Sequence, residues 1–246
     1  MSSEAKYTFM GHLRELRSCL LRSVIAILIA LPISFFLADK VLNILMQPVP
    51  GLELVYTEVT EMLGTYIKVS LYSALVLTLP FIVYQAVMFV RPALTRKEKS
   101  YLYTMLPSVF LLFTVGAVFA YFVLLPPALK FLLTFGSDIA TPMIRVENYV
   151  SVLTKLIFWI GMCFEIPLVM FFLTKIGVLK PEWLSKYRRL AYILAFVLGA
   201  IITPTFDPLN QTLVAVPVIL LFEFGILLSK LARRKKTEIA LNDSDA

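Results

Sequence analysis

One carboxylate lies in the middle of an apolar stretch that is long enough to cross a membrane. The stretch runs from Lys155 to Lys175, and Glu165 is the only charged residue between these two lysines. As a helix at about 1.5 Å per residue it covers roughly 28 Å, close to the thickness of the hydrocarbon core of a bilayer. Its many Leu, Ile, Val and Phe residues together outweigh a cost of about 3 kcal/mol for one central acidic residue. The segment is therefore expected to insert in spite of Glu165.

A proline follows this carboxylate at a distance of two residues. Because Pro167 has no N–H, the carbonyl of Cys163 loses its helical partner, and a kink or a local gap in hydrogen bonding is expected within one turn of Glu165. Two interpretations of Glu165 stay open: a carboxyl that hydrogen-bonds to a neighbouring helix and only stabilises the fold, or a functional polar site in mid-membrane. The cost of ionisable groups inside membranes favours the functional interpretation.

The sequence lacks the usual signatures of catalysis. It has no His-Glu-x-x-His, Gly-x-Ser-x-Gly or phosphate-loop motif, and its single histidine, His12, precedes the first apolar span. No pair of aspartates lies at the centre of facing spans, as an intramembrane aspartyl protease would need. We therefore expect no enzyme activity, no metal and no cofactor. A proton-coupled small-solute permease is the alternative, because Glu165 in a kinked helix resembles a proton or cation site.

The composition indicates an integral membrane protein. Hydrophobic residues make up 59% of the chain and charged residues only 16%, with a mean hydropathy of +0.85. The net charge of +7 comes from short basic clusters beside apolar spans, which is typical of membrane topology rather than of nucleic-acid binding. Cys19 and Cys163 lie at or inside apolar spans, so no disulfide framework is expected. No cleaved signal peptide is expected either.

The hydropathy pattern predicts an all-α fold with six transmembrane helices. The third span would measure about 50 Å as one helix, so it must tilt, break at Pro126-Pro127 or project beyond the bilayer. The fifth would cover only about 21 Å, so the bilayer is expected to thin around it. The predicted spans are Cys19 to Leu37, Tyr66 to Val90, Tyr101 to Phe135, Lys155 to Lys175, Leu190 to Thr203 and Leu209 to Leu228.

The distribution of basic residues predicts the orientation. With both termini, the 91–99 loop and the 175–189 loop on one side, most of the 23 Lys and Arg residues fall on that side. The positive-inside rule then makes both termini cytoplasmic. Residues 1–228 are expected to form a single membrane domain, and residues 229–246 a disordered cytoplasmic tail. Residues 39–65 are expected to hold two short interfacial helices on the outer side.

Five short motifs occur in order along the chain. They are His12-Leu13-Arg14-Glu15-Leu16-Arg17, Arg91-Pro92-Ala93-Leu94 with Glu98-Lys99, Tyr121-Phe122 with Pro126 and Phe131, Phe164-Glu165-Ile166-Pro167, and Thr203-Pro204 with Asp207-Pro208 and Gln211. Together they resemble the TatC family, the multi-span receptor subunit of the twin-arginine protein translocase. The resemblance extends from His12 to Glu223, and its specificity lies in the order of the motifs and the matching topology.

This resemblance implies a function in the bacterial inner membrane. Such a subunit binds the twin-arginine signal peptides of folded cargo at its cytoplasmic face. It assembles with single-span TatA- and TatB-type partners into an oligomeric complex that uses the proton-motive force. The resemblance further implies that Glu15, Arg17 and Glu98 belong to the signal-peptide-binding region. Glu165 would be a mid-membrane polar site on the concave face of a cupped helix arrangement.

Several polar residues also have simpler interpretations. Glu15 could pair with nearby arginines at a solvated helix start, and Asp207 could cap the sixth helix. Glu223 lies less than two turns from Lys230, which suggests a snorkelling or paired carboxylate at the inner boundary. The residues that could be either structural or functional are His12, Pro48, Gln85, Phe89, Asp207 and Gln211.

Overall fold

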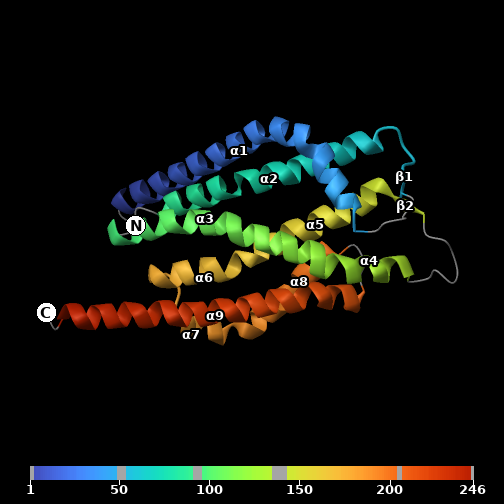
Figure 1. Ribbon diagram of the computed structural model, residues 1–246. Coiled ribbons are helices and arrows are strands. Elements are labelled where there is room, and N and C mark those ends of the chain that lie inside the picture. The colour runs from blue at the N-terminus through green and yellow to red at the C-terminus, as the bar shows by residue number, and fades with distance from the viewer. Residues whose placement is uncertain (1–2, 49–53, 91–95, 135–142, 204–206, 245–246) are drawn as a thin grey trace. The chain divides into compact units, whose positions relative to one another are not determined.

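The computed structural model is built almost entirely of helices (Figure 1). It describes the backbone of residues 3–48, 54–90, 96–134, 143–203 and 207–244, and the side chains of residues 14–48, 54–86, 89, 106–134, 143–203 and 207–233. The chain divides into two compact units. The first comprises residues 1–44 and 58–110, and the second comprises residues 45–57 and 111–246.

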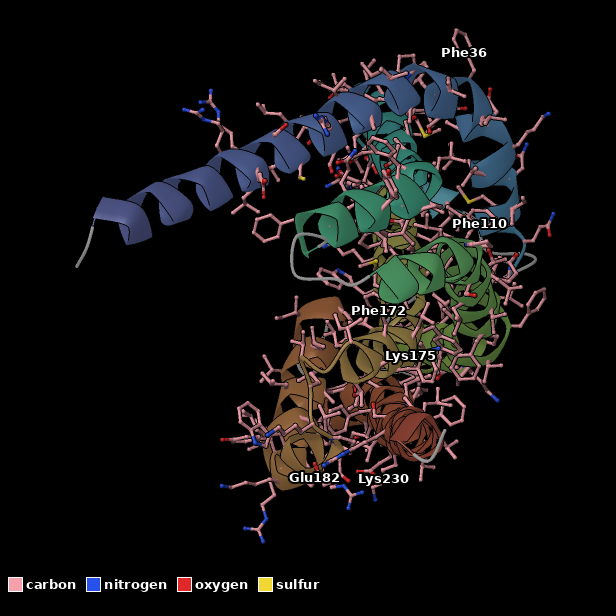
Figure 2. All side chains as sticks on the ribbon, turned by 90° about the vertical axis from the view of Figure 1, so that its left-hand side faces the viewer. Phe36, Phe110, Phe172, Lys175, Glu182 and Lys230 are labelled. Atoms are coloured by element: carbon pink, nitrogen blue, oxygen red, sulfur yellow. The ribbon has the colours of Figure 1, made fainter. Side chains whose placement is uncertain are left out.

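The first unit contains most of α1 (Ser3–Met46), all of α2 (Glu61–Val90) and the first part of α3 (Arg96–Phe119). Large apolar side chains cover the outside of α1. Phe36 is 84% exposed and points away from the helix in Figure 2. A continuous exposed apolar surface of this kind suits lipid rather than water.

The end of α1 is tied to the start of α2 by polar and aromatic contacts. The Tyr66 hydroxyl donates a hydrogen bond to Asp39 Oδ1, and the rings of Phe35 and Tyr66 lie 6.3 Å apart. The prediction of two separate interfacial helices in residues 39–65 is wrong. No proline or glycine occurs between Pro32 and Pro48, so α1 continues to Met46, and the second apolar segment forms the first turns of α2.

The second unit holds the remaining helices and one small sheet. Strands β1 (Leu54–Val55) and β2 (Ile144–Arg145) pair in parallel. Beside them, the buried Tyr149 hydroxyl donates to the Leu45 carbonyl at 3.2 Å. The helical elements are the end of α3, η2 (Ala120–Leu124), α4 (Leu125–Thr134), α5 (Val146–Phe164), α6 (Ile166–Lys175), α7 (Pro181–Lys186), α8 (Arg188–Ile202) and α9 (Pro208–Ser244).

The third predicted span, Tyr101 to Phe135, changes its backbone hydrogen bonding about one turn before Pro126-Pro127. Residues Ala120–Leu124 form a π-helical turn, and the N–H of Leu125 donates to the carbonyl of Ala120. Pro126 and Pro127 have no N–H to donate, so regular α-helical bonding cannot continue through this region. The helix therefore adjusts without breaking at the prolines.

Five of the described helical segments are long and apolar enough to cross a membrane. They are Arg14–Met46, Glu61–Ala86, Leu106–Thr134, Val146–Lys175 and Pro208–Arg233. The predicted fifth run corresponds to α8, which has only 15 residues. Helix α9 runs to Ser244, so the described backbone beyond residue 228 is helical, where the sequence predicted a disordered tail. The single domain over residues 1–228 stays a prediction.

Candidate functional site

Glu165 lies at the junction between α5 and α6. Its N–H donates to the carbonyl of Met162, only three residues back, at 3.1 Å. Regular helical bonding resumes where Val169 N–H donates to the Glu165 carbonyl at 2.9 Å. Pro167, in the first turn of α6, cannot donate to Cys163. The predicted gap in helical hydrogen bonding within one turn of the carboxylate is confirmed.

Two glycines allow α3 and α5 to approach closely beside this junction. A Cβ atom on Gly116 would lie 2.8 Å from the ring of Phe164, and a Cβ atom on Gly161 would lie 2.6 Å from the ring of Phe113. Each aromatic ring therefore packs against the glycine of the opposite helix. This reciprocal packing fixes the end of α5 just before Glu165.

Helix α6 is held on the other side of the junction by α9. A Cβ atom on Gly225 would lie 2.6 Å from Sδ of Met170 and 3.2 Å from Cα of Pro167. Only a glycine lets the backbone of α9 come this close to the proline. The break beside Glu165 is thus enclosed by packing from both sides.

The carboxyl of Glu165 is buried by this packing, and the described residues offer it no hydrogen bond of normal geometry. The residue is only 6% exposed, and neither carboxyl oxygen has a hydrogen-bond partner among the described residues. The main chain at Phe113 lies beside it without forming a hydrogen bond of normal geometry. Buried polar atoms without partners are rare and cost about 1–3 kcal/mol. The described part of the chain therefore buries this carboxyl without satisfying its hydrogen-bonding capacity.

Asp207 and Gln211 organise the junction between α8 and α9. Asp207 Oδ1 accepts from the backbone N–H of Asn210 at 2.7 Å, and Oδ2 accepts from Asn210 Nδ2 at 2.9 Å. The capping interpretation of Asp207 is confirmed. Gln211 Nε2 donates to the carbonyl of Phe196 at 2.8 Å and so ties α9 to α8.

Glu223 joins the same two helices further along. Its Oε2 lies 2.9 Å from a guanidinium nitrogen of Arg188, and its Oε1 accepts from the Tyr192 hydroxyl at 2.7 Å. Glu223 is therefore a paired carboxylate, which is one of the two interpretations given above. Its cationic partner among the described residues is Arg188 on α8. Glu182 on α7 pairs with Arg233 on α9. A hydrogen bond from its own backbone amide, together with Arg233, lowers the pKa of Glu182.

The signal-binding candidates belong to the first unit. Glu15 and Arg17 are exposed on α1. Glu98 lies near the start of α3, and its side chain is outside the described residues. The starts of α1 and α3 lie at the same end of this unit (Figure 1). The role of these three residues stays a prediction.

The other candidate residues lie in different surroundings. Gln85 is 5% exposed on α2, and its Oε1 has no hydrogen-bond partner among the described residues. Phe89 is half-buried one turn further along α2, and Pro48 is half-buried just after α1. His12 is on α1, with its side chain outside the described residues. The positions of these four residues do not distinguish a structural role from a functional one, so their roles stay predictions.

Sequence reasoning missed the residues that shape the Glu165 junction. Gly116 and Gly161 lie inside predicted spans, where glycine often marks close helix contact, and this signal could have found them. Their aromatic partners, and the pairing of Arg188 with Glu223, depend on which helices are neighbours. The order of residues along the chain does not reveal this.

A protein-family model described as Sec-independent protein translocase protein (TatC) matches residues 11–217. The chain belongs to the TatC family. This TatC chain is 45% identical over 234 residues to the Sec-independent protein translocase protein TatC of Aquifex aeolicus (strain VF5), with 93% of this chain and 97% of the relative covered. The TatC of Carboxydothermus hydrogenoformans (strain ATCC BAA-161 / DSM 6008 / Z-2901) is 37% identical over 231 residues, with 93% and 95% covered.

A solved structure agrees with the fold of this TatC chain. The crystal structure of the twin arginine translocase receptor TatC superposes with a TM-score of 0.81 at 44% identity, over 90% of this chain and 99% of that one. The family predicted from the sequence motifs is confirmed. Among the described residues, no group of three or more His, Cys, Asp or Glu side chains could hold a metal ion.

Proposed function

We propose that this chain is the receptor subunit of a twin-arginine translocase and binds the twin-arginine signal peptides of folded proteins. The observation that carries the proposal is the agreement with a twin arginine translocase receptor over 90% of the chain, at a TM-score of 0.81. The five helical segments that could cross a membrane support this function. In this account the protein binds and assembles, and carries out no covalent chemistry.

Glu15 and Glu98, with Arg17 beside the first, form the proposed signal-binding site. Each arginine of the signal presents a planar fork of donors that a carboxylate accepts bidentately, and lysine cannot reproduce this geometry. Receptor carboxylates are therefore the groups suited to distinguish arginine from lysine. The exposure of Glu15 on α1 and the position of Glu98 near the start of α3 support this assignment.

Glu165 is proposed to bind the membrane span of a single-span TatA- or TatB-type partner. Its burial and its two unpaired oxygens support this role, because a polar group in hydrocarbon gains from a hydrogen-bonding partner.

The proposed topology has six spans, with both termini in the cytoplasm and the protein in the bacterial inner membrane. Helix α8 is the sixth crossing, in addition to the five longer segments. The basic clusters at the two predicted inner loops support this orientation.

Thiol labelling of intact cells tests the orientation. In a background without Cys19 and Cys163, Glu53→Cys and Arg145→Cys are expected to react with a membrane-impermeant thiol reagent. Glu182→Cys, at an exposed position on α7, should react only after the membrane is permeabilised. In the unaltered protein, Cys163 is buried and should resist the reagent both before and after the membrane is permeabilised. Labelling of Glu182→Cys from outside, without labelling of the other two, would overturn the orientation.

Retention of a signal peptide tests the proposed function. The detergent-purified protein should retain a twin-arginine signal peptide and release it when both arginines of the signal are replaced by lysines. Equal retention of the two peptides contradicts the receptor function. Loss of selective retention together with proton-coupled solute uptake in proteoliposomes would favour the permease.

A further inference from the structure

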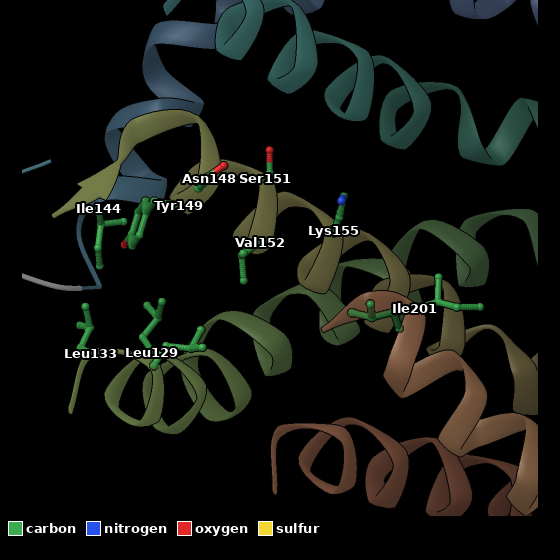
Figure 3. Close-up of a pocket in the computed structure, with 11 residues that line it drawn as sticks. Leu129, Leu133, Ile144, Asn148, Tyr149, Ser151, Val152, Lys155 and Ile201 are labelled. Atoms are coloured by element: carbon green, nitrogen blue, oxygen red, sulfur yellow. The ribbon is translucent and has the colours of Figure 1, made fainter. Parts of the chain in front are cut away.

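A pocket lies where α8 ends, between the C-terminal end of this helix and helices α4 and α5 (Figure 3). Its volume is about 490 Å³. Apolar side chains from two helices form much of its wall. They are Leu129, Leu132 and Leu133 of α4, and Ile201 and Ile202 at the end of α8.

The α5 side of the pocket is mixed, with two polar residues and one lysine next to Tyr149 and Val152. Asn148, Ser151 and Lys155 follow one another at spacings of three and four residues, so they share one face of the helix. Figure 3 shows their polar ends directed to one side, away from Leu129 and Leu133. The pocket thus combines an apolar wall with a polar edge.

Lys155 is the charged group of this edge. Its side chain is exposed and forms no ion pair with any described residue. It lies in a helical segment, Val146–Lys175, that is long enough to cross the membrane. A cation at such a position is costly unless it pairs with an anion or reaches water, and for this reason it marks a candidate binding site.

The length of α8 explains how a lipid phosphate could reach this lysine. With 15 residues, α8 covers about 22 Å, which is less than the roughly 30 Å of a bilayer core. A bilayer adapts to a short span by thinning around it. Because Ile201 and Ile202 lie in the same pocket as Lys155, headgroups next to the end of α8 are brought toward the level of the ammonium group.

We infer that this pocket binds an anionic phospholipid. The lipid phosphate is bound by Lys155, and an acyl chain packs against the leucines of α4 and Ile201. Among the described residues that line the pocket there is no aspartate or glutamate, so none of them pairs with the cationic headgroup of a zwitterionic lipid. Lys155 is the one charged residue of this described lining, and it therefore favours a lipid with net negative charge.

Native mass spectrometry of the detergent-purified protein tests this site with two lipids, phosphatidylglycerol and phosphatidylcholine. Phosphatidylglycerol should bind more tightly. Lys155→Gln should weaken phosphatidylglycerol binding by about fivefold and leave phosphatidylcholine binding unchanged. Leu133→Trp, which fills the apolar side of the pocket, should weaken the binding of both lipids.

Lys130→Gln is the matched control for Lys155→Gln, because Lys130 is an exposed lysine on α4, the helix of the pocket leucines, but does not line the pocket. It should bind both lipids as the unaltered protein does. The inference is overturned if Lys155→Gln keeps its affinity for phosphatidylglycerol, or if Lys130→Gln loses as much. Equal affinity of the unaltered protein for the two lipids, or unchanged binding by Leu133→Trp, would also overturn it.

Discussion

Glu98→Ala and Glu15→Ala are each expected to weaken the binding of a twin-arginine signal peptide by about tenfold to a hundredfold, with the larger loss for Glu98. A hydrogen bond to a charged group contributes roughly 1.5–3 kcal/mol, which corresponds to this range. The predicted cytoplasmic side of the chain is strongly basic, so a cationic signal is repelled unless carboxylates are specifically placed. The measurement is the fluorescence anisotropy of a labelled signal peptide with each purified variant.

Glu58→Ala is the matched control for these two variants. Glu58 is an exposed carboxylate of the same unit, but it lies just before α2, at the other end of that helix from the loop to α3. Its replacement should change the affinity little, because an exposed charge far from the ligand is screened by salt. An equal loss in all three variants would mean that net charge, and not a site, determines the affinity.

Glu165→Leu is expected to weaken association with a single-span partner by roughly threefold to thirtyfold, and Glu165→Gln much less. Hydrogen bonds between helices in membranes contribute about 0.6–2 kcal/mol, and leucine can form none. Glutamine has nearly the same shape and keeps both a donor and an acceptor. Both variants should still insert, since the surrounding span is strongly apolar. The measurement is site-specific crosslinking of each variant to the partner span.

Comparison of these two variants distinguishes the interpretations of Glu165. If Glu165→Gln is as defective as Glu165→Leu and a proton flux is also lost, a proton-relay or permease role is favoured. If neither variant changes crosslinking, Glu165 only stabilises the chain. A loss of thermal stability in Glu165→Leu without a change in crosslinking would indicate the same.

The apolar helices and the break at Glu165 could be predicted because local chemistry determines them. Runs of Leu, Ile, Val and Phe predict spans wherever they occur, and Pro167 removes a backbone donor in any fold. The short α8 and the irregular stretch before Pro126-Pro127 follow from the length of apolar runs and from proline in the same way. Capping by Asp207, one of its two interpretations, could be anticipated because N-capping depends on residues within one turn.

The contacts between helices could not be predicted, because they depend on which spans are neighbours. Nothing along the chain connects Gly161 with Phe113, or Gln211 with the carbonyl of Phe196. The end of α1 was wrongly predicted for a related reason. Helix α1 continues through Pro32, and no further proline or glycine occurs before Pro48, which lies beyond the point where the apolar span was expected to end.

The most direct test of the signal-binding account is a double-mutant cycle between receptor and signal. The affinity of the unaltered protein and of a Glu15→Ala/Glu98→Ala variant is measured for a signal peptide with two arginines and for the same peptide with two lysines. If these glutamates bind the arginines, the lysine substitutions should weaken binding to the unaltered protein strongly and add little further loss in the double variant. Full additivity of the receptor and signal substitutions would contradict the account, because the arginines would then be recognised by other groups.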